Sequence, residues 1–156
     1  MARRTVLTIG NFDGVHAGHA ALLTRARAIA ASTGDAPRVV ALAFFPHPMA
    51  VLAPGRAPAT LTTFETRKRL LLAAGADEVV RLDPEHGLLE RTAEEFVDDL
   101  VRDYAPVAIV EGPDFHFGKG RRGTIDTLRA LGERHGFAVE VVHPVAVRLT
   151  DSREVP

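Results

Sequence analysis

Two histidines stand three residues apart near the start of the chain, in a segment rich in glycine. Residues 10–19 spell Gly-Asn-Phe-Asp-Gly-Val-His-Ala-Gly-His, so the two rings belong to His16 and His19. A helix that begins near Val15 would place both rings on one face of its first turn, beside unpaired backbone N–H groups and the positive end of the helix dipole. Gly18 would let a bulky ligand approach the backbone. The pattern predicts an anion site that stabilises charge during phosphoryl-group transfer.

Two other interpretations of this histidine pair remain open. His-x-x-His could supply two metal ligands, but no third ligand stands nearby in the sequence, so we assign no metal site. The two side chains could also be ordinary capping and surface residues at the start of a helix. Three glycines within ten residues favour a functional turn over this simpler interpretation.

A second glycine-rich segment, residues 111–123, is cationic. It contains Lys119, which is one of only two lysines in the chain, and the adjacent pair Arg121 and Arg122. A flexible basic loop suits a polyphosphate. Phe115 and Phe117 could stack on a planar ring or could simply pack in the core. The segment therefore predicts a polyphosphate-binding loop, with a solvated basic turn as the alternative.

Two familiar phosphate-loop patterns fit this second segment poorly. A Walker A loop has four residues between its glycines, whereas five separate Gly112 from Gly118, and Gly120 stands where Ser or Thr must hold magnesium. Residues 118–123 do match G-x-G-x-x-G, but too little chain follows to build a dinucleotide-binding domain from this point.

A third segment, Phe44-Phe45-Pro46-His47-Pro48, follows an apolar run. Its two prolines hold the backbone around His47 in an extended conformation. The residue types fit a ligand-facing histidine and a rigid turn with a half-buried histidine equally well.

The elements that must position these segments alternate between strand and helix. Apolar runs predict strands at residues 5–9, 38–45, 78–82, 106–110 and 137–142, with a candidate sixth strand at the sheet edge at 145–149. Helical spacing predicts helices at 17–31, 67–74, 92–104 and 124–135. Capping boxes are expected from Thr62 to Glu65 and from Thr92 to Glu95. Residues 46–58 are expected to be irregular.

This order predicts a Rossmann-like, doubly wound α/β/α sandwich on a mostly parallel sheet of five or six strands. Ligands of such sheets bind beyond the C-terminal ends of the strands. Segments 10–19 and 111–123 both follow such an end, so we expect them to meet there.

The composition is that of one globular domain of 156 residues, with 46% hydrophobic and 25% charged residues. A formal net charge of -1 argues against a global electrostatic hold on nucleic acid or an anionic membrane. The absence of cysteine excludes thiol catalysis and thiolate zinc sites. No apolar run approaches a membrane span or a secretory signal, so we expect a cytoplasmic protein; the sequence gives no indication of the oligomeric state.

Together, the three segments resemble the signatures of bacterial FAD synthetases. The turn at residues 10–19 resembles the flavin-specific form of the His-x-Gly-His motif of the nucleotidyltransferase superfamily, as found in their N-terminal FMN adenylyltransferase module. Asp-Phe-x-Phe-Gly-Lys-x-Arg-x-Gly at 114–123 resembles a second signature, and Phe-x-Pro-His-Pro followed by Leu61-Thr62-Thr63 resembles a third. The matches run in the family's order from residue 5 to residue 147.

The resemblance implies adenylyl transfer from ATP to FMN, which gives FAD and pyrophosphate, with Mg²⁺ bridging the phosphates. It implies that His16 and His19 are catalytic. The implied residues of the nucleotide turn are Gly10, Asn11, Phe12, Asp13 and Gly18. Those of the flavin side are Phe45, Pro46, His47 and Pro48. Those that hold nucleotide or flavin in the second segment are Asp114, Phe115, Phe117, Gly118, Lys119 and Arg121.

Two departures from the family pattern qualify this expectation. Residues 111–113 are Glu-Gly-Pro, where a pair of small residues is more usual before the aspartate. The family continues into a Ser/Thr/Arg motif and a riboflavin kinase domain, and neither occurs in residues 1–156, so we expect a single, C-terminally incomplete domain with impaired turnover. The alternatives are a nucleotidyltransferase for another phosphorylated acceptor, or a nucleotide- or flavin-binding domain without turnover.

Overall fold

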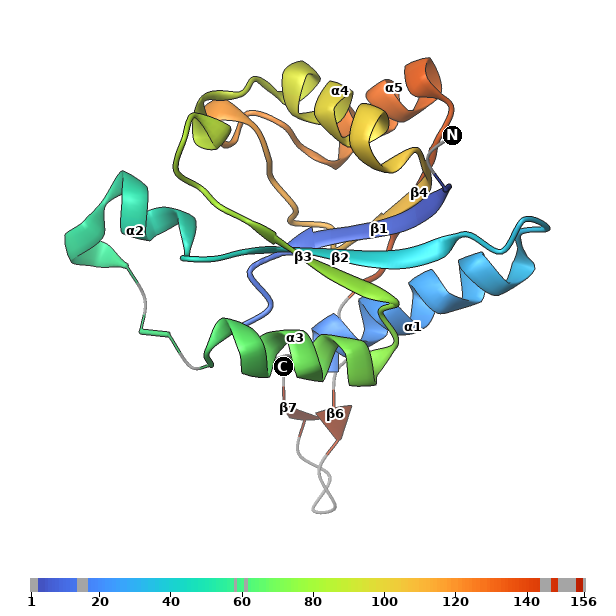
Figure 1. The fold of residues 1–156 in the computed structure, drawn as a ribbon, viewed down its shortest axis with the longest axis horizontal. Coiled ribbons are helices and arrows are strands. Elements are labelled where there is room, and N and C mark those ends of the chain that lie inside the picture. The colour runs from blue at the N-terminus through green and yellow to red at the C-terminus, as the bar shows by residue number, and fades with distance from the viewer. Residues whose placement is uncertain are drawn as a thin grey trace.

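Five parallel strands form the central sheet of the computed structural model, which describes residues 3–13, 17–57, 59–60, 62–143, 147–148 and 154–155 (Figure 1). The strands are β1 (Thr5–Gly10), β2 (Arg38–Phe44), β3 (Glu78–Leu82), β4 (Pro106–Glu111) and β5 (Ala138–Val141), in the order β3-β2-β1-β4-β5. All four pairings are parallel, so the five C-terminal ends lie along one edge of the sheet. The predicted fold class is confirmed.

Helices cover both faces of the sheet, as Figure 1 shows. On one face lie α1 (Ala17–Ser32) and α3 (Phe64–Ala74), and on the other lie α4 (Ala93–Tyr104) and α5 (Ile125–His135). The inner strands therefore have no polar face. In β2, Val39 packs in the cluster under α1 and α3, whereas Val40 packs in the cluster under α4 and α5. This two-sided burial explains why the strands are continuous apolar runs.

Side-chain caps account for the starts of α3 and α4. The predicted capping box at α4 is confirmed, because Thr92 accepts from the Glu95 N–H and the Glu95 side chain accepts from the Thr92 N–H. The one predicted for α3 is wrong by one residue: Thr63, not Thr62, caps this helix by accepting from the Thr66 N–H. Thr62 instead binds a carboxylate of another segment, described below.

Two further predictions are corrected. The stretch after β2 contains a short helix, α2 (Pro48–Leu52), and a 3₁₀ turn at Pro54–Arg56. Pro48 suits the first helical position because its missing N–H needs no partner there, and His47 caps the helix. The candidate sixth strand does not extend the central sheet: β6 (Val147–Arg148) pairs antiparallel with β7 (Glu154–Val155) in a separate ribbon. In the described part of the chain, no helix is long and apolar enough to cross a membrane.

The strand order creates a switch point between β1 and β4. From β1 the chain moves outward through β2 to β3 and then crosses to β4 on the other side of β1. Regular pairing of β1 with β4 runs only to Leu7 and Ile109. The two strands thus part toward their C-terminal ends, where doubly wound sheets bind ligands.

Candidate functional site

A buried carboxyl group lies between the parting ends of β1 and β4. Glu111, the last residue of β4, is 3% exposed, and its Oε1 accepts from the Ile9 N–H at 2.6 Å. Burial raises the pKa of Glu111 well above its ordinary value, and the Ile9 hydrogen bond opposes this increase. The sequence had marked Glu111 only as a departure from the family pattern.

Phe12 anchors the turn after β1 to the hydrophobic core. This side chain is 1% exposed and packs in the core under α1, while its backbone adopts φ 54°. Its ring meets the His19 ring edge-on, with 5.1 Å between centroids. A Cβ on Gly10 would lie 3.3 Å from Phe12 Cζ. Phe12 therefore supports the turn from the core, and a glycine at position 10 leaves room for its ring.

The start of α1 holds the part of the histidine pair that the structure describes. His19 is half-buried on the first turn of α1, and Gly18 beside it is exposed. His16, together with Gly14 and Val15, lies outside the described residues, so its position next to His19 remains a prediction. Leu61 of the third signature also lies outside them.

Asp13 ties the same turn to the start of α3. Its Oδ1 accepts from the Thr62 N–H at 2.8 Å and from the Thr62 hydroxyl at 2.6 Å. The same oxygen lies 3.4 Å from Nη2 of Arg67. The predicted Asp13 thus acts, within this structure, as an anchor between two segments that are 49 residues apart.

Arg67 of α3 is the central group of this cluster and was missed by the sequence analysis. It is 3% exposed. Its Nη1 donates to the backbone oxygens of Asn11, at 2.9 Å, and Phe44, at 3.1 Å, and its Nη2 donates to that of Thr62 at 3.5 Å. A signal was available: Arg67 lies at helical spacing from Phe64 and Leu71, on the face that packs on the core.

The segment after β2 is held by two arginines. The Phe45 ring has the guanidinium of Arg67 5.2 Å from its centroid and that of Arg81 at 5.0 Å. Arg81 also donates to the Phe45 backbone oxygen, and the Phe45–Pro46 peptide bond is cis. His47 Nδ1 accepts from the Met49 N–H at 3.0 Å. Burial and the charge of Arg67 lower the pKa of His47 from its ordinary value, and the charge of Asp13 opposes this shift.

The loop after β4 is built around a close pairing of its two ends. Phe117 and Gly123 exchange two backbone hydrogen bonds, at 3.1 and 2.8 Å. Phe115 stacks on Phe117 with 5.5 Å between centroids, and Phe117 is buried against Phe96. The backbone of Gly118 has φ 75°, and a Cβ there would lie 2.7 Å from the Ala93 nitrogen. The loop is therefore pressed onto the start of α4.

The polar residues of this loop point outward. Asp114, Lys119 and Arg121 are exposed. The Lys119 N–H donates to the Arg91 backbone oxygen at 2.8 Å, which fixes the backbone but leaves the Lys119 side chain in solvent. Lys119 and Arg121 follow the C-terminal end of β4, at the same edge of the sheet as the start of α1.

A small apolar hollow of about 40 Å³ joins the ends of β1 and β2 to the loop after β4. Its walls are Ile9, Phe44, Leu88, Leu89, Phe96, Phe115, His116, Phe117 and Gly118. Aromatic and aliphatic walls suit a planar ring, although this volume is far below the roughly 300–1,000 Å³ that is usual for ligand pockets. A ring would therefore need Phe115 or its neighbours to move.

Sequence comparison assigns the family. Residues 1–153 match the protein family described as FAD synthetase. The chain belongs to the FAD synthetase family. It is 40% identical over 144 residues to a bifunctional riboflavin kinase/FMN adenylyltransferase from Pseudomonas fluorescens, a match that covers 92% of this chain and 45% of that protein. It is 33% identical over 150 residues to an FAD synthetase from Listeria monocytogenes, covering 96% and 60%.

A solved structure supports the fold. This FAD synthetase family chain superposes with a TM-score of 0.79 on a crystal structure described as a macrolide-efflux protein from Streptococcus pneumoniae, at 25% identity, covering 98% of this chain and 48% of the other. The chain spans about half the length of the curated relatives it matches.

The structure brings the three predicted segments of this FAD synthetase family member to one edge. The turn at Gly10–Asp13 and the Phe45–Pro48 segment meet at Arg67, which binds the Asn11 oxygen and lies against the Phe45 ring. The loop with Phe115 and Phe117 meets the ends of β1 and β2 at the apolar hollow. The site residues were predicted from separate stretches, but Arg67 and Glu111, which hold those stretches together, were not.

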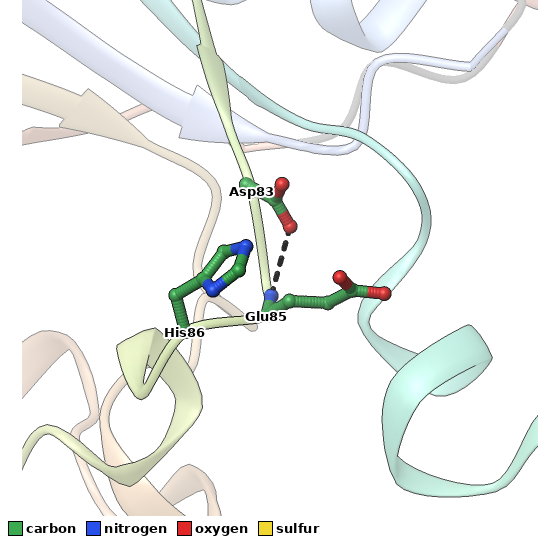
Figure 2. Close-up of side chains that lie close together, drawn as sticks. All are labelled: Asp83, Glu85 and His86. Carbon is green, nitrogen blue, oxygen red and sulfur yellow. Dashed lines mark hydrogen bonds between the residues drawn. The ribbon is translucent and has the colours of Figure 1, made fainter.

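Two other features lie outside these segments. Asp83, Glu85 and His86 follow β3, and one ligand atom from each lies within 4.8 Å of the others (Figure 2). Asp83 already accepts from the Glu85 N–H, and exposed acidic groups are common without a metal, so the cluster carries no assignment. A larger hollow of about 290 Å³ is lined by Arg27, Arg38 and Asp77, near the starts of the strands and away from the predicted segments.

Proposed function

We propose that this chain transfers the adenylyl group of ATP to FMN, giving FAD and pyrophosphate. The observation that carries the proposal is the meeting of three segments at the switch point of a parallel sheet, in a member of the FAD synthetase family. A phosphate oxygen of FMN would attack the α-phosphorus of ATP in line. The bond from that phosphorus to the bridging oxygen would break, and pyrophosphate would leave with the electron pair. FMN arrives ionised, so the step needs no general base.

The residues divide between the two substrates. His19, with His16, would stabilise charge on the transferring group at the start of α1, where backbone N–H groups also favour an anion. Gly10–Asp13 would shape the nucleotide pocket, and the exposed Lys119 and Arg121 would contact phosphates. Phe45–Pro48 and the stacked Phe115 and Phe117 would form the flavin side.

Mg²⁺ would arrive as part of the ATP substrate. Two carboxylates of the described residues at this site are already engaged: Asp13 by Thr62 and Arg67, and Glu111 by Ile9 in a buried position that favours its neutral form. They do not fit a resident Mg²⁺ site. Mg²⁺ retains several waters and commonly binds substrate phosphates, which suits a metal that enters with the triphosphate.

The first test is calorimetric titration of this chain with FMN, with and without an unreactive ATP analogue and Mg²⁺. We expect FMN to bind and the analogue to change its affinity. Parallel titrations with phosphopantetheine, nicotinate mononucleotide and glycerol phosphate test the acceptor. Binding of one of these instead of FMN would overturn the acceptor assignment. Formation of FAD, measured with ATP itself, separates an enzyme from a binding domain without turnover.

A further inference from the structure

Arg67 contacts the nucleotide turn and the segment after β2 at once. On the first side it binds the Asn11 backbone oxygen and pairs with Asp13. On the second side it binds the Phe44 backbone oxygen and lies against the Phe45 ring. These segments follow the adjacent strands β1 and β2, and Arg67 binds both of them.

We propose that Arg67 is a positioning residue that couples nucleotide binding to FMN binding. This inference rests on the proposed function, because that function assigns the turn to ATP and the Phe45 segment to FMN. Arg67 contacts neither the FMN phosphate oxygen nor the α-phosphorus of ATP. A change in the position of one loop is transmitted through Arg67 to the other loop.

The chemistry of the guanidinium explains how one group can do this. Arginine presents five N–H donors in a rigid plane, whose face can also stack on an aromatic ring. At Arg67 the edge of that plane meets the backbone oxygens of Asn11 and Phe44, and the group lies 5.2 Å from the Phe45 centroid. Moving the turn therefore tilts the plane, and tilting the plane moves Phe45.

Burial makes this arrangement sensitive to either loop. At 3% exposure, a guanidinium that loses an acceptor cannot regain it from bulk water. A ligand that orders Asn11 and Asp13 keeps the guanidinium in place and so favours the bound position of Phe45. Thermodynamic reciprocity then requires FMN to favour nucleotide binding by the same factor.

Arg67→Lys is the substitution that tests this role most directly. It keeps the positive charge opposite Asp13 but has a compact ammonium that cannot bridge two loops and stack on a ring together. Arg69→Lys is the matched control, because Arg69 lies in the same helix with an exposed side chain. Arg81→Lys is a second control, because Arg81 contacts Phe45 from β3, a strand that does not pair with β1.

The test measures FMN affinity with and without an unreactive ATP analogue plus Mg²⁺ in these four chains. In the unaltered chain and in Arg69→Lys, the analogue should tighten FMN binding by about 5- to 150-fold, the usual range of such couplings. In Arg67→Lys the factor should fall to about twofold or less. In Arg81→Lys the FMN affinity itself should weaken while the factor is retained. An undiminished factor in a folded Arg67→Lys chain overturns the proposal.

A second measurement needs no variant and so does not depend on whether Arg67→Lys folds. Hydrogen exchange by mass spectrometry, on the unaltered chain with the analogue alone, should show slower exchange in residues 44–52 as well as in residues 10–13. Unchanged exchange in residues 44–52 with the analogue bound overturns the coupling.

The two measurements separate the failure of this proposal from that of the proposed function. Binding of the analogue without FMN would refute the FMN assignment, and the exchange of residues 44–52 would then decide whether the turn and that segment are coupled. Binding of neither ligand would refute both.

Discussion

The Glu111 carboxyl accepts a hydrogen bond from the Ile9 N–H, 2.6 Å away, across the gap between β4 and β1. Regular pairing of these strands runs only to Leu7 and Ile109, so this side chain satisfies a backbone donor that the neighbouring strand leaves open. The bond allows β1 and β4 to part at the switch point without an orphaned donor. The geometry of the candidate site depends on that parting.

Glu111 should make the stability of the protein fall as pH rises. Its pKa is raised in the folded state from an ordinary value of 4.5, so the folded chain binds more protons than the unfolded chain above that pH. The stabilisation is complete below about pH 4.5 and is lost as pH rises toward the folded pKa, at up to about 1.4 kcal/mol per pH unit. Glu111→Gln keeps an acceptor for Ile9 and should flatten this dependence in urea unfolding measured from pH 4.5 upward. An identical pH profile in the variant would contradict the assignment.

The hydrogen bond itself can be tested at one pH with a second substitution. Glu111→Leu leaves the Ile9 N–H without a partner and should lower the free energy of unfolding by about 1–3 kcal/mol relative to Glu111→Gln. Equal stability of the two variants would show that Ile9 finds another acceptor.

Gly118 should tolerate a methyl group far less well than Gly120. Both have positive φ, 75° and 65°, so alanine at either position costs about 1–2 kcal/mol of backbone strain. Only at Gly118 would the new Cβ meet backbone, 2.7 Å from the Ala93 nitrogen; at Gly120 it meets only the Arg122 side chain at 3.8 Å. We expect Gly118→Ala to destabilise by about 1–3 kcal/mol more than Gly120→Ala in chemical denaturation. Equal losses would mean that the loop is not pressed onto α4.

Substitutions of the adjacent residues Thr62 and Thr63 should have different effects, one on ligand affinity and the other on stability. Thr63 caps α3, so Thr63→Ala should lower the free energy of unfolding by about 1 kcal/mol and leave ligand affinity nearly unchanged. Thr62→Ala removes the hydroxyl that donates to Asp13 and frees the nucleotide turn, so it should weaken binding of the ATP analogue. Calorimetry and thermal unfolding of both variants check this separation. Similar analogue affinities for the two would refute the anchoring of the turn by Thr62.

His19 should contribute directly to nucleotide affinity. A hydrogen bond to a charged phosphate contributes about 1.5–3 kcal/mol, so His19→Ala should weaken binding of the ATP analogue by about 10- to 150-fold. His86→Asn is the control: His86 is exposed after β3 with φ 60°, a conformation that asparagine tolerates. Equal affinities in the two variants, measured by titration after a thermal-unfolding check, would place the phosphates away from α1.

Much of the fold follows from local patterns. The apolar runs of β1, β2 and β4 predicted buried strands, because strands covered on both faces carry hydrophobic residues continuously. The Thr92–Glu95 box marked the start of α4, and Gly136 marked the C-terminal end of α5, because capping depends on only a few neighbouring residues. The α3 cap was placed one residue early, since two adjacent threonines offer the same local chemistry and only the distant Asp13 distinguishes them.

The strand and helix order, the three segments with candidate chemistry and their resemblance to the FAD synthetases all follow from the amino-acid sequence. The contacts that hold those segments together become visible in the folded chain. Arg67 resembles any surface arginine until α3 packs on the sheet and buries it among the oxygens of Asn11 and Phe44. Glu111 resembles an exposed strand end until β1 and β4 part around it. Both depend on residues far apart along the chain, and the burial that makes a charged group form such bonds arises only when the whole sheet is assembled.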